Sequence, residues 1–152
     1  MLLRQMSARR IGKRLFTTEG PTAPLAVTNT LHRFFHVLDG IGDSSMGELF
    51  TDGGTMHVMK ASLMLTGSAE VDAWCARMRE MWDGKATLHT ESNIVLSNPE
   101  PGVFVNHSVW TAIIDGTVTS YGTHADVLEA TTAEAGLEFK FRRRVIRHLY
   151  AA

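Results

Sequence analysis

The sequence predicts an α+β domain of 152 residues in which a strongly curved antiparallel sheet wraps around about three N-terminal helices. Three observations predict this class. Apolar residues recur at helical spacing in the first half of the chain, runs rich in β-branched and aromatic residues fill the second half, and an Asp-Gly pair joins two of these runs. A sheet bent in this way encloses a cone-shaped interior, and its apolar mouth is a place for a small ligand.

Two helices and a short third one are expected before the long strands. In residues 25–41, the apolar side chains of Val27, Leu31, Phe34, Phe35 and Leu38 recur every three or four positions, which is typical of an amphipathic helix. A short second helix is expected through residues 46–50, capped by Asp43 or Ser44. A further helix is expected to begin at Gly67-Ser68 and to stop before Asp83-Gly84.

Strands are expected over residues 55–59, 63–65, 87–96, 103–114, 117–130 and 137–149, with a polar loop over residues 131–136. Asp115-Gly116 is a strong signal for a two-residue hairpin loop, because both central positions favour positive φ. If that loop is the whole connection, His107 faces His124 and Trp110 faces Tyr121 across the two strands. A slip of one residue would remove both pairs.

The composition limits the class of protein and its partners. With 44% hydrophobic and 20% charged residues the chain fits one domain, no run is long enough for a membrane span, and the single Cys75 excludes an internal disulfide. Residues 19–152 carry ten basic and sixteen acidic side chains, which disfavours binding to nucleic acid. The expected partners are therefore a small hydrophobic molecule and a second copy of the chain, without nucleic acid or membrane.

The N-terminal segment differs in charge from the rest of the chain. Residues 1–18 carry five basic and no acidic side chains, as in a mitochondrial transit peptide, although a disordered basic tail has the same composition. We therefore expect a basic extension and linker over residues 1–24 and the folded domain over residues 25–150. The location is mitochondrial if residues 1–18 are a transit peptide, and otherwise cytoplasmic.

Several short runs, in this order and spacing, resemble the SnoaL-like branch of the nuclear transport factor two-like, or cystatin-like cone, superfamily. The resemblance covers about residues 26–146. The runs are Phe34-Phe35-His36-Val37-Leu38-Asp39-Gly40, Glu48-Leu49-Phe50-Thr51-Asp52-Gly53-Gly54, Thr87-Leu88-His89-Thr90-Glu91-Ser92-Asn93 and Gly122-Thr123-His124-Ala125-Asp126, with Gly67 opening a helix. The scaffold hosts dehydratases, isomerases, cyclases, epoxide hydrolases and plain binding modules, so fold alone does not select among them.

Within that branch the sequence is similar to scytalone dehydratase-like and polyketide cyclase-like enzymes, in which an aspartate near the end of the first helix faces a histidine at the start of a strand. Asp39 and His89 match those two positions. A carboxylate beside an imidazole fixes the tautomer of the ring and raises its basicity, so the pair can move a proton without metal or cofactor. The resemblance thus implies a cofactor-independent lyase or isomerase acting on a small hydrophobic cyclic or polyketide-like substrate.

Two features keep a second interpretation open. Leu38 stands where the dehydratase pattern has a tyrosine, and no second histidine of that pattern is found, so a group that polarises a carbonyl is missing. The alternative is a non-catalytic ligand-binding or dimerisation module on the same fold. A catalytic cavity needs another hydroxyl or imidazole, so the candidate substrate-binding residues are His57, His107, Tyr121, Trp110 and Phe35.

Two other groups of residues are interpreted as structural. His107 and His124, with Asp126 as a conceivable third ligand, are too few for a convincing metal site, and no metal is expected. Arg142, Arg143, Arg144 and Arg147 alternate between the faces of the last strand, which is typical of a solvated or dimer-facing strand. The exposed side of the sheet, with Val109, Trp110 and these arginines, is expected to pair with a second copy.

Overall fold

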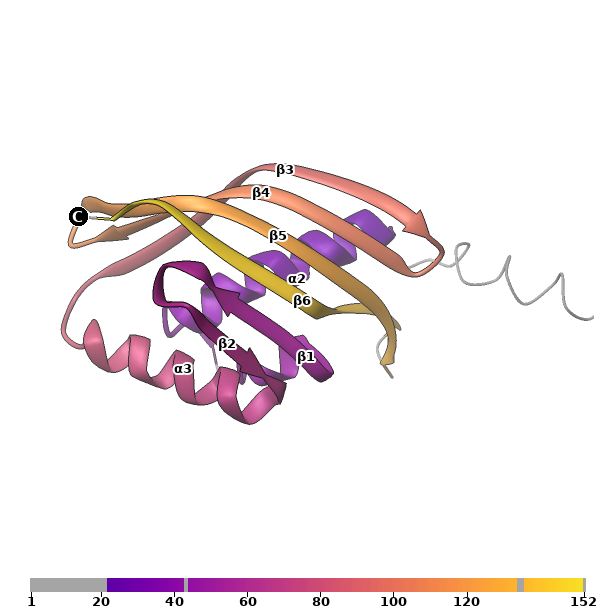
Figure 1. Ribbon diagram of the computed structural model, residues 1–152, viewed down its shortest axis with the longest axis horizontal. Coiled ribbons are helices and arrows are strands. Elements are labelled where there is room, and N and C mark those ends of the chain that lie inside the picture. The colour runs from indigo at the N-terminus through magenta and orange to yellow at the C-terminus, as the bar shows by residue number, and fades with distance from the viewer. Residues whose placement is uncertain (1–21, 43, 134–135, 152) are drawn as a thin grey trace, which may run out of the picture.

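The computed structural model describes residues 22–42, 44–133 and 136–151, and the predictions for residues 1–21 and for Asp43 lie outside them. Two α-helices and a six-stranded sheet make up the described chain (Figure 1). The elements are α2 (Ala23–Leu38), η1 (Gly47–Leu49), β1 (Phe50–Val58), η2 (Met59–Ala61), β2 (Leu63–Thr66), α3 (Gly67–Met81), β3 (Thr87–Glu100), β4 (Val103–Ile114), β5 (Thr117–Ala133) and β6 (Gly136–Ala151).

The predicted first helix is present as α2. Pro24 lies in its first turn, where the missing amide proton costs nothing, and the apolar stripe that includes Val27, Leu31 and Phe34 is buried. The helix packs beneath the sheet, against β3 and β6 (Figure 1). Its last residue, Leu38, is buried as well, so the chain leaves the helix at Asp39 inside the domain.

The predicted second helix is not confirmed, and the described residues hold two α-helices rather than about three. Gly47–Leu49 form only a single 3₁₀ turn, and Phe50 already begins β1. The Phe50 ring packs on Phe141, its partner in β6, with ring centroids 5.2 Å apart. Sheet pairing therefore takes over before a second turn of helix can form.

The sheet has the strand order β2-β1-β6-β5-β4-β3, and every neighbouring pair is antiparallel except β1 with β6. In Figure 1 the long strands arch over α2, while α3 lies against the short strands β1 and β2. β1 begins earlier than predicted and contains residues 51–54, which a register shift accommodates. β5 likewise runs to Ala133, into the predicted loop.

The β4–β5 hairpin has the predicted loop but not the predicted register. Ile114 pairs with Thr117, and Asp115 and Gly116 have φ of 49° and 77°, as the Asp-Gly signal requires. Between the pairs Ala112 with Ser120 and Ile113 with Val118, however, β5 contains one extra residue. Every later pair is displaced by one position.

The two cross-strand pairs predicted from the simple register are therefore wrong. The observed pairs are His107 with Ala125, Ser108 with His124, Trp110 with Gly122, and Thr111 with Tyr121. His107 and His124 point to opposite faces of the sheet: His124 is buried among the helices and His107 is exposed. They cannot share a metal or a proton.

The core lies between the concave face of the sheet and the two helices. Its buried apolar side chains come from α2, the segment around η1, α3 and every strand except β3, which contributes the partly buried Ile94 and Leu96. Within the described residues, neither helix is long and apolar enough to cross a bilayer.

Candidate functional site

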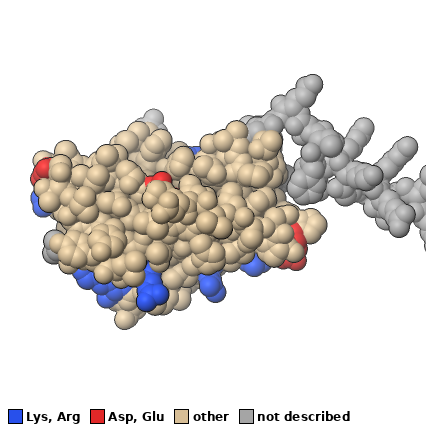
Figure 2. All heavy atoms as spheres, turned by 90° about the horizontal axis from the view of Figure 1, so that it is seen from above, with Lys and Arg blue, Asp and Glu red and all other residues tan. Residues whose placement is uncertain are grey.

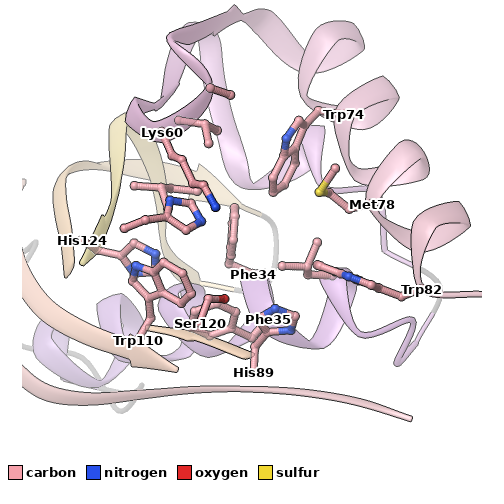
Figure 3. Close-up of a pocket in the computed structure, with 15 residues that line it drawn as sticks. Phe34, Phe35, Lys60, Trp74, Met78, Trp82, His89, Trp110, Ser120 and His124 are labelled. Carbon is pink, nitrogen blue, oxygen red and sulfur yellow. The ribbon is translucent and has the colours of Figure 1, made fainter. Parts of the chain in front are cut away.

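A cavity of about 340 Å³ opens between α2, α3 and the concave face of the sheet (Figure 3). Aromatic rings dominate its walls, and all three tryptophans of the chain contribute. The lining residues are Phe34, Phe35, Leu38, Val58, Lys60, Ala61, Trp74, Met78, Trp82, His89, Trp110, Ser120, His124, Ile146 and His148. Such a cavity suits a flat apolar ligand held by a few polar groups.

The end of α2 places Asp39 beside this cavity. Asp39 is the C-terminal cap of the helix, and its backbone N–H donates to the carbonyl of Phe35 at 2.8 Å. Gly40 follows with φ of 75°, a left-handed conformation that turns the chain away from the helix. From α3, the guanidinium of Arg79 donates to the carbonyl of Val37 and so satisfies one of the free acceptors at this helix end.

The Asp39 carboxylate makes two hydrogen bonds to His89. Its Oδ1 lies 2.5 Å from His89 Nδ1, and its Oδ2 accepts the backbone N–H of His89 at 2.8 Å. The side chains of Asp39 and His89 are only 2% and 4% exposed. Burial raises the pKa of Asp39, but the hydrogen bonds from the ring and backbone of His89 lower it more, so the net pKa lies below its ordinary value.

The hydrogen bond between Asp39 and Nδ1 fixes the tautomer of His89. An anionic carboxylate at Nδ1 requires the proton there, which leaves the Nε2 lone pair to accept a proton. The ring is also held by Phe35, stacked on it at 5.5 Å with planes 7° apart, and by Trp82 at 5.1 Å. Within the described residues, Nε2 forms no hydrogen bond. With Nδ1 held by Asp39, Nε2 is the nitrogen of His89 that can accept a proton at the cavity wall.

A second buried polar cluster lies deeper in the cone. His124 Nδ1 is 2.9 Å from Glu91 Oε1, and Arg144 reaches His124, Asp126 and Glu91 at 2.5, 3.3 and 3.7 Å. The guanidinium of Arg144 is fully buried and lies over the Phe34 ring, 4.1 Å from its centroid. Asn106 and Ser108 complete the cluster, donating to Asp126 and Glu91 respectively.

Burial and charge set the protonation of this cluster. Burial raises the pKa of Asp126 to about 7, although Arg144 opposes that rise. Burial and the Arg144 cation lower the pKa of His124 to about 3. Burial raises the pKa of Glu91, but hydrogen bonding to His124 and the charge of Arg144 bring it down to about 2. Near neutral pH the cluster therefore pairs anionic Glu91 and cationic Arg144 with a neutral His124.

Glu91, His124 and Asp126 could in principle hold a metal ion. One ligand atom from each lies within 4.8 Å of the others. Arg144, however, already places a cation against all three groups, at the distances given above. A divalent ion would have to displace or repel this guanidinium, so the residues fit an internal ion pair better than a metal site.

Replacing Asp126 with asparagine should change how stability depends on pH. Between an unfolded pKa near 3.8 and a folded pKa of about 7, the folded protein binds one more proton at Asp126 than the unfolded chain. The free energy of unfolding therefore falls as pH rises through this window, by about 1.4 kcal/mol per pH unit for this group. The asparagine side chain mimics the protonated acid and does not titrate.

The urea-unfolding free energy of Asp126→Asn relative to the natural chain should thus improve steadily with pH across that window and level off above it. Glu91 and His124 also contribute to the pH dependence in this window, because they titrate there in the unfolded chain, but both proteins carry these two groups and the contributions cancel in the difference. A difference independent of pH would show that Asp126 is ionised throughout.

The structure brings some of the predicted site residues together and separates others. Asp39 and His89 are in contact, and Phe35 and Trp110 line the cavity. The predicted cavity positions of His57, His107 and Tyr121 are not found. His57 lies between the buried residues Met56 and Val58 and so faces away from the core.

His107 and Tyr121 both point away from the cavity: His107 lies between the buried residues Asn106 and Ser108 of β4, and Tyr121 precedes the buried Gly122 of β5. His107 lines a hollow on the outer face of the sheet instead of the cavity. Tyr121 is 42% exposed and stacks on Tyr150, with ring centroids 5.5 Å apart. By contrast, Trp110 is almost completely buried, which also removes it from the outer face expected to pair with a second copy.

Three polar residues of the cavity wall, Lys60, Ser120 and His148, were not singled out from the sequence. Lys60 follows a predicted strand and has no distinguishing neighbour, and Ser120 and His148 lie in strands where a polar residue commonly faces water. For Glu91 a signal was present: it is two residues after His89, so both point to the same face of one strand.

No family model and no curated protein sequence matches the chain. Solved structures do match. A scytalone dehydratase-like protein from Novosphingobium aromaticivorans superposes with a TM-score of 0.68 and 19% identity over 84% of each chain. Aln2 from Streptomyces gives 0.71 and 20% identity over 84% of this chain and 93% of its own.

A Nostoc punctiforme protein with a cystatin-like fold gives a TM-score of 0.67 and 16% identity over 82% of this chain and 90% of its own. These identities are low, and the likeness concerns the fold. The resemblance drawn from the short sequence runs is confirmed at that level: the chain has a cystatin-like α+β fold, in which a curved sheet covers the helices.

Proposed function

We propose that the protein is a cofactor-independent lyase or isomerase that transfers a proton on a small, hydrophobic, cyclic or polyketide-like substrate. The observation that carries this proposal is the buried Asp39–His89 pair at the wall of an aromatic cavity. The solved structures of the same fold include a scytalone dehydratase-like protein, which supports the same class of reaction.

In the proposed reaction His89 Nε2 removes a proton from a carbon next to a carbonyl group. The C–H electron pair forms the enolate double bond, and the carbonyl π pair moves to the oxygen. In an isomerisation the imidazolium returns the proton to another carbon. In a dehydration the enolate expels a β-hydroxyl group, which takes that proton and leaves as water. Asp39 stabilises the imidazolium formed in between.

The walls of the cavity support the cyclic, apolar nature of the substrate. Phe35, Trp82 and Trp110 present large rings on which a flat molecule can stack, and few polar groups line the cavity.

Hydrogen exchange tests the proposal without knowledge of the natural product. The protein is incubated in D₂O with tetralone and its β-hydroxy and 1,3-diketone analogues, and loss of the α-proton signal is followed by NMR. We expect catalysed exchange by the natural chain and, with the β-hydroxy ketone, conversion to the dehydrated, unsaturated ketone, detected by mass spectrometry. The His89→Gln variant, which keeps a polar side chain of similar size, should not catalyse exchange.

The same experiment distinguishes the proposed function from the non-catalytic alternative. If the ketones quench the fluorescence of the cavity tryptophans but no exchange is catalysed, the protein is a non-catalytic binding module and our proposal fails. None of His57, His107 and Tyr121 lines the cavity, which by itself favours that alternative. A hydroxyl and two further imidazoles are nevertheless present there, from Ser120, His124 and His148.

We also propose that the outer face of the sheet pairs with a second copy. Figure 2, viewed over β3 and β4, shows a broad surface almost free of charged side chains, with basic groups gathered along one edge. A hollow on the outer face is lined by Met59, Val95, Val109, Ala125 and Val145 together with polar residues that include Asn93, His107 and Arg147, and Val95 is 63% exposed in the single chain. Apolar surface of this kind is costly to leave in water.

Light scattering after size-exclusion chromatography should accordingly give twice the mass of the chain. Val95→Glu should give a monomer, because a charge would be buried in the interface. Val118→Glu is the matched control: Val118 is also exposed but lies at the tip of the β4–β5 hairpin, outside the hollow. A monomeric natural chain would refute the dimer.

A further inference from the structure

The cavity has a second polar end, away from the Asp39–His89 pair. Three polar side chains from separate elements line the cavity besides the histidines named above: Lys60 of η2, Ser120 of β5 and His148 of β6. In Figure 3 Lys60 points its amino group into the cavity from the side opposite His89, and the Ser120 hydroxyl lies on the His89 side of the same cavity, beside Phe35 in this view. The carbonyl-polarising group that is missing from the sequence pattern can be sought here.

Local structure places Lys60 over the cavity. β1 ends at Val58, and the chain reverses through the single 3₁₀ turn Met59–Ala61 with Ser62 in a left-handed conformation at φ of 49°. The turn leads directly into β2, so both of its ends are fixed by the sheet. Lys60 and Ala61 are the two turn residues that line the cavity.

Within the described residues, none of these three side chains is committed to another partner. Lys60 forms no ion pair, and neither Ser120 Oγ nor the His148 ring forms a hydrogen bond. His148 Nδ1 is buried, which leaves Nε2 for a ligand. Burial and the charge of Lys60 lower the pKa of His148, so the imidazole is neutral and Lys60 is the cation of this end.

We infer that Lys60, assisted by Ser120 and His148, forms a binding site for an acidic oxygen of the ligand. The ligand class is a flat cyclic compound that carries an enol, phenol or carboxyl oxygen at the Lys60 end and an exchangeable C–H near His89. This inference rests on the proposed function and adds its missing part: the ammonium receives the negative charge that reaches the carbonyl oxygen when His89 takes the proton.

The inference is tested by binding, which does not require turnover. All three tryptophans line the cavity, so their fluorescence reports its occupation. The probes are 2-naphthoate, which carries an anionic oxygen, and 2-naphthamide, which has the same rings and no charge. At neutral pH we expect the natural chain to bind the naphthoate about 10-fold more tightly than the amide, as one charge-assisted hydrogen bond allows.

The Lys60→Met variant should lose this preference and keep its affinity for the amide. Lys85→Met is the matched control, because it removes the same charge from a residue outside the cavity, and it should behave as the natural chain. Ser120→Ala should give a smaller loss of preference. An unchanged preference in Lys60→Met, equal binding of both probes by the natural chain, or no binding of either would overturn the inference.

The binding and exchange experiments distinguish failure of the oxygen site from failure of the proposed proton transfer. If Lys60→Met loses the preference but the natural chain catalyses no exchange, the oxygen site stands and the proposed proton transfer does not. If exchange occurs and is insensitive to Lys60, the proton transfer stands and the oxygen site is refuted. His89→Gln should lose exchange while it keeps the preference for naphthoate.

Discussion

Asp39→Asn should lower the rate of catalysed α-proton exchange by roughly 10²- to 10⁴-fold, the range that a positioned acid or base contributes. The carboxylate makes two hydrogen bonds to His89, at 2.5 Å to Nδ1 and 2.8 Å to the backbone N–H. An asparagine can still accept the backbone N–H, but its amide group then faces Nδ1. The amide donates a proton there, so His89 adopts the other tautomer and Nε2 loses its lone pair.

The size of this effect is measured by the NMR exchange assay, with circular dichroism to check folding. Because Asp39 acts through His89, the double variant Asp39→Asn/His89→Gln should be no slower than His89→Gln alone. Asp39→Asn should also leave the affinity for 2-naphthamide unchanged. A loss of exchange below about threefold would mean that the ring is oriented by Phe35 and Trp82 alone.

Much of this site was predictable because it depends on local patterns. The periodicity of α2 placed Asp39 at a helix end, the fold resemblance placed His89 at the start of a strand, and the structure brings the two side chains together. The Asp115-Gly116 loop was predicted for the same reason, since the backbone conformation is a property of those two residues.

The register of the strands was not predictable, because bulges leave little trace in a sequence. One extra residue in β5, opposite the step from Ala112 to Ile113, was enough to exchange the faces of His107 and Tyr121 relative to their partners. The same applies to Arg144. Strict alternation from Phe139 and Phe141 would turn Arg143 inward, but a register shift after Phe141 turns Arg144 inward instead.

The polar cluster follows from that shift. Arg144 pairs with Asp126 in β5, which pairs with Asn106 in β4, so three inward polar residues stand side by side across neighbouring strands. None of them is unusual in its own segment, and only the assembled sheet makes them contacts. Alternation predicts a solvated or dimer-facing strand for the four arginines; Arg142, Arg143 and Arg147 are exposed, but Arg144 is fully buried.

Gly122→Ala should be the most destabilising single substitution in the sheet, with a loss of about 4 kcal/mol or more in the free energy of unfolding. Gly122 pairs with Trp110 on one side and with His148 on the other. A Cβ atom there would overlap the Arg147 carbonyl oxygen and lie 2.9 Å from Cζ2 of Trp110. The first contact is with backbone, so a side-chain rotation cannot relieve it.

Relief would require β6 to move away from β5 at the register shift beside Gly122, and that movement would break the edge contact of Trp110 with His148, whose centroids are 4.8 Å apart. The cavity wall would change with it. Gly84→Ala is the matched control: a Cβ at Gly84 meets nothing within 4 Å, so only its φ of 72° opposes the change, at about 1 to 2 kcal/mol. Urea titrations of both variants compare the two costs. If Gly122→Ala were no more costly than Gly84→Ala, β5 and β6 would not approach as closely as the structure has them, and the positions of Trp110, Ser120 and His148 around the ligand would have to be revised.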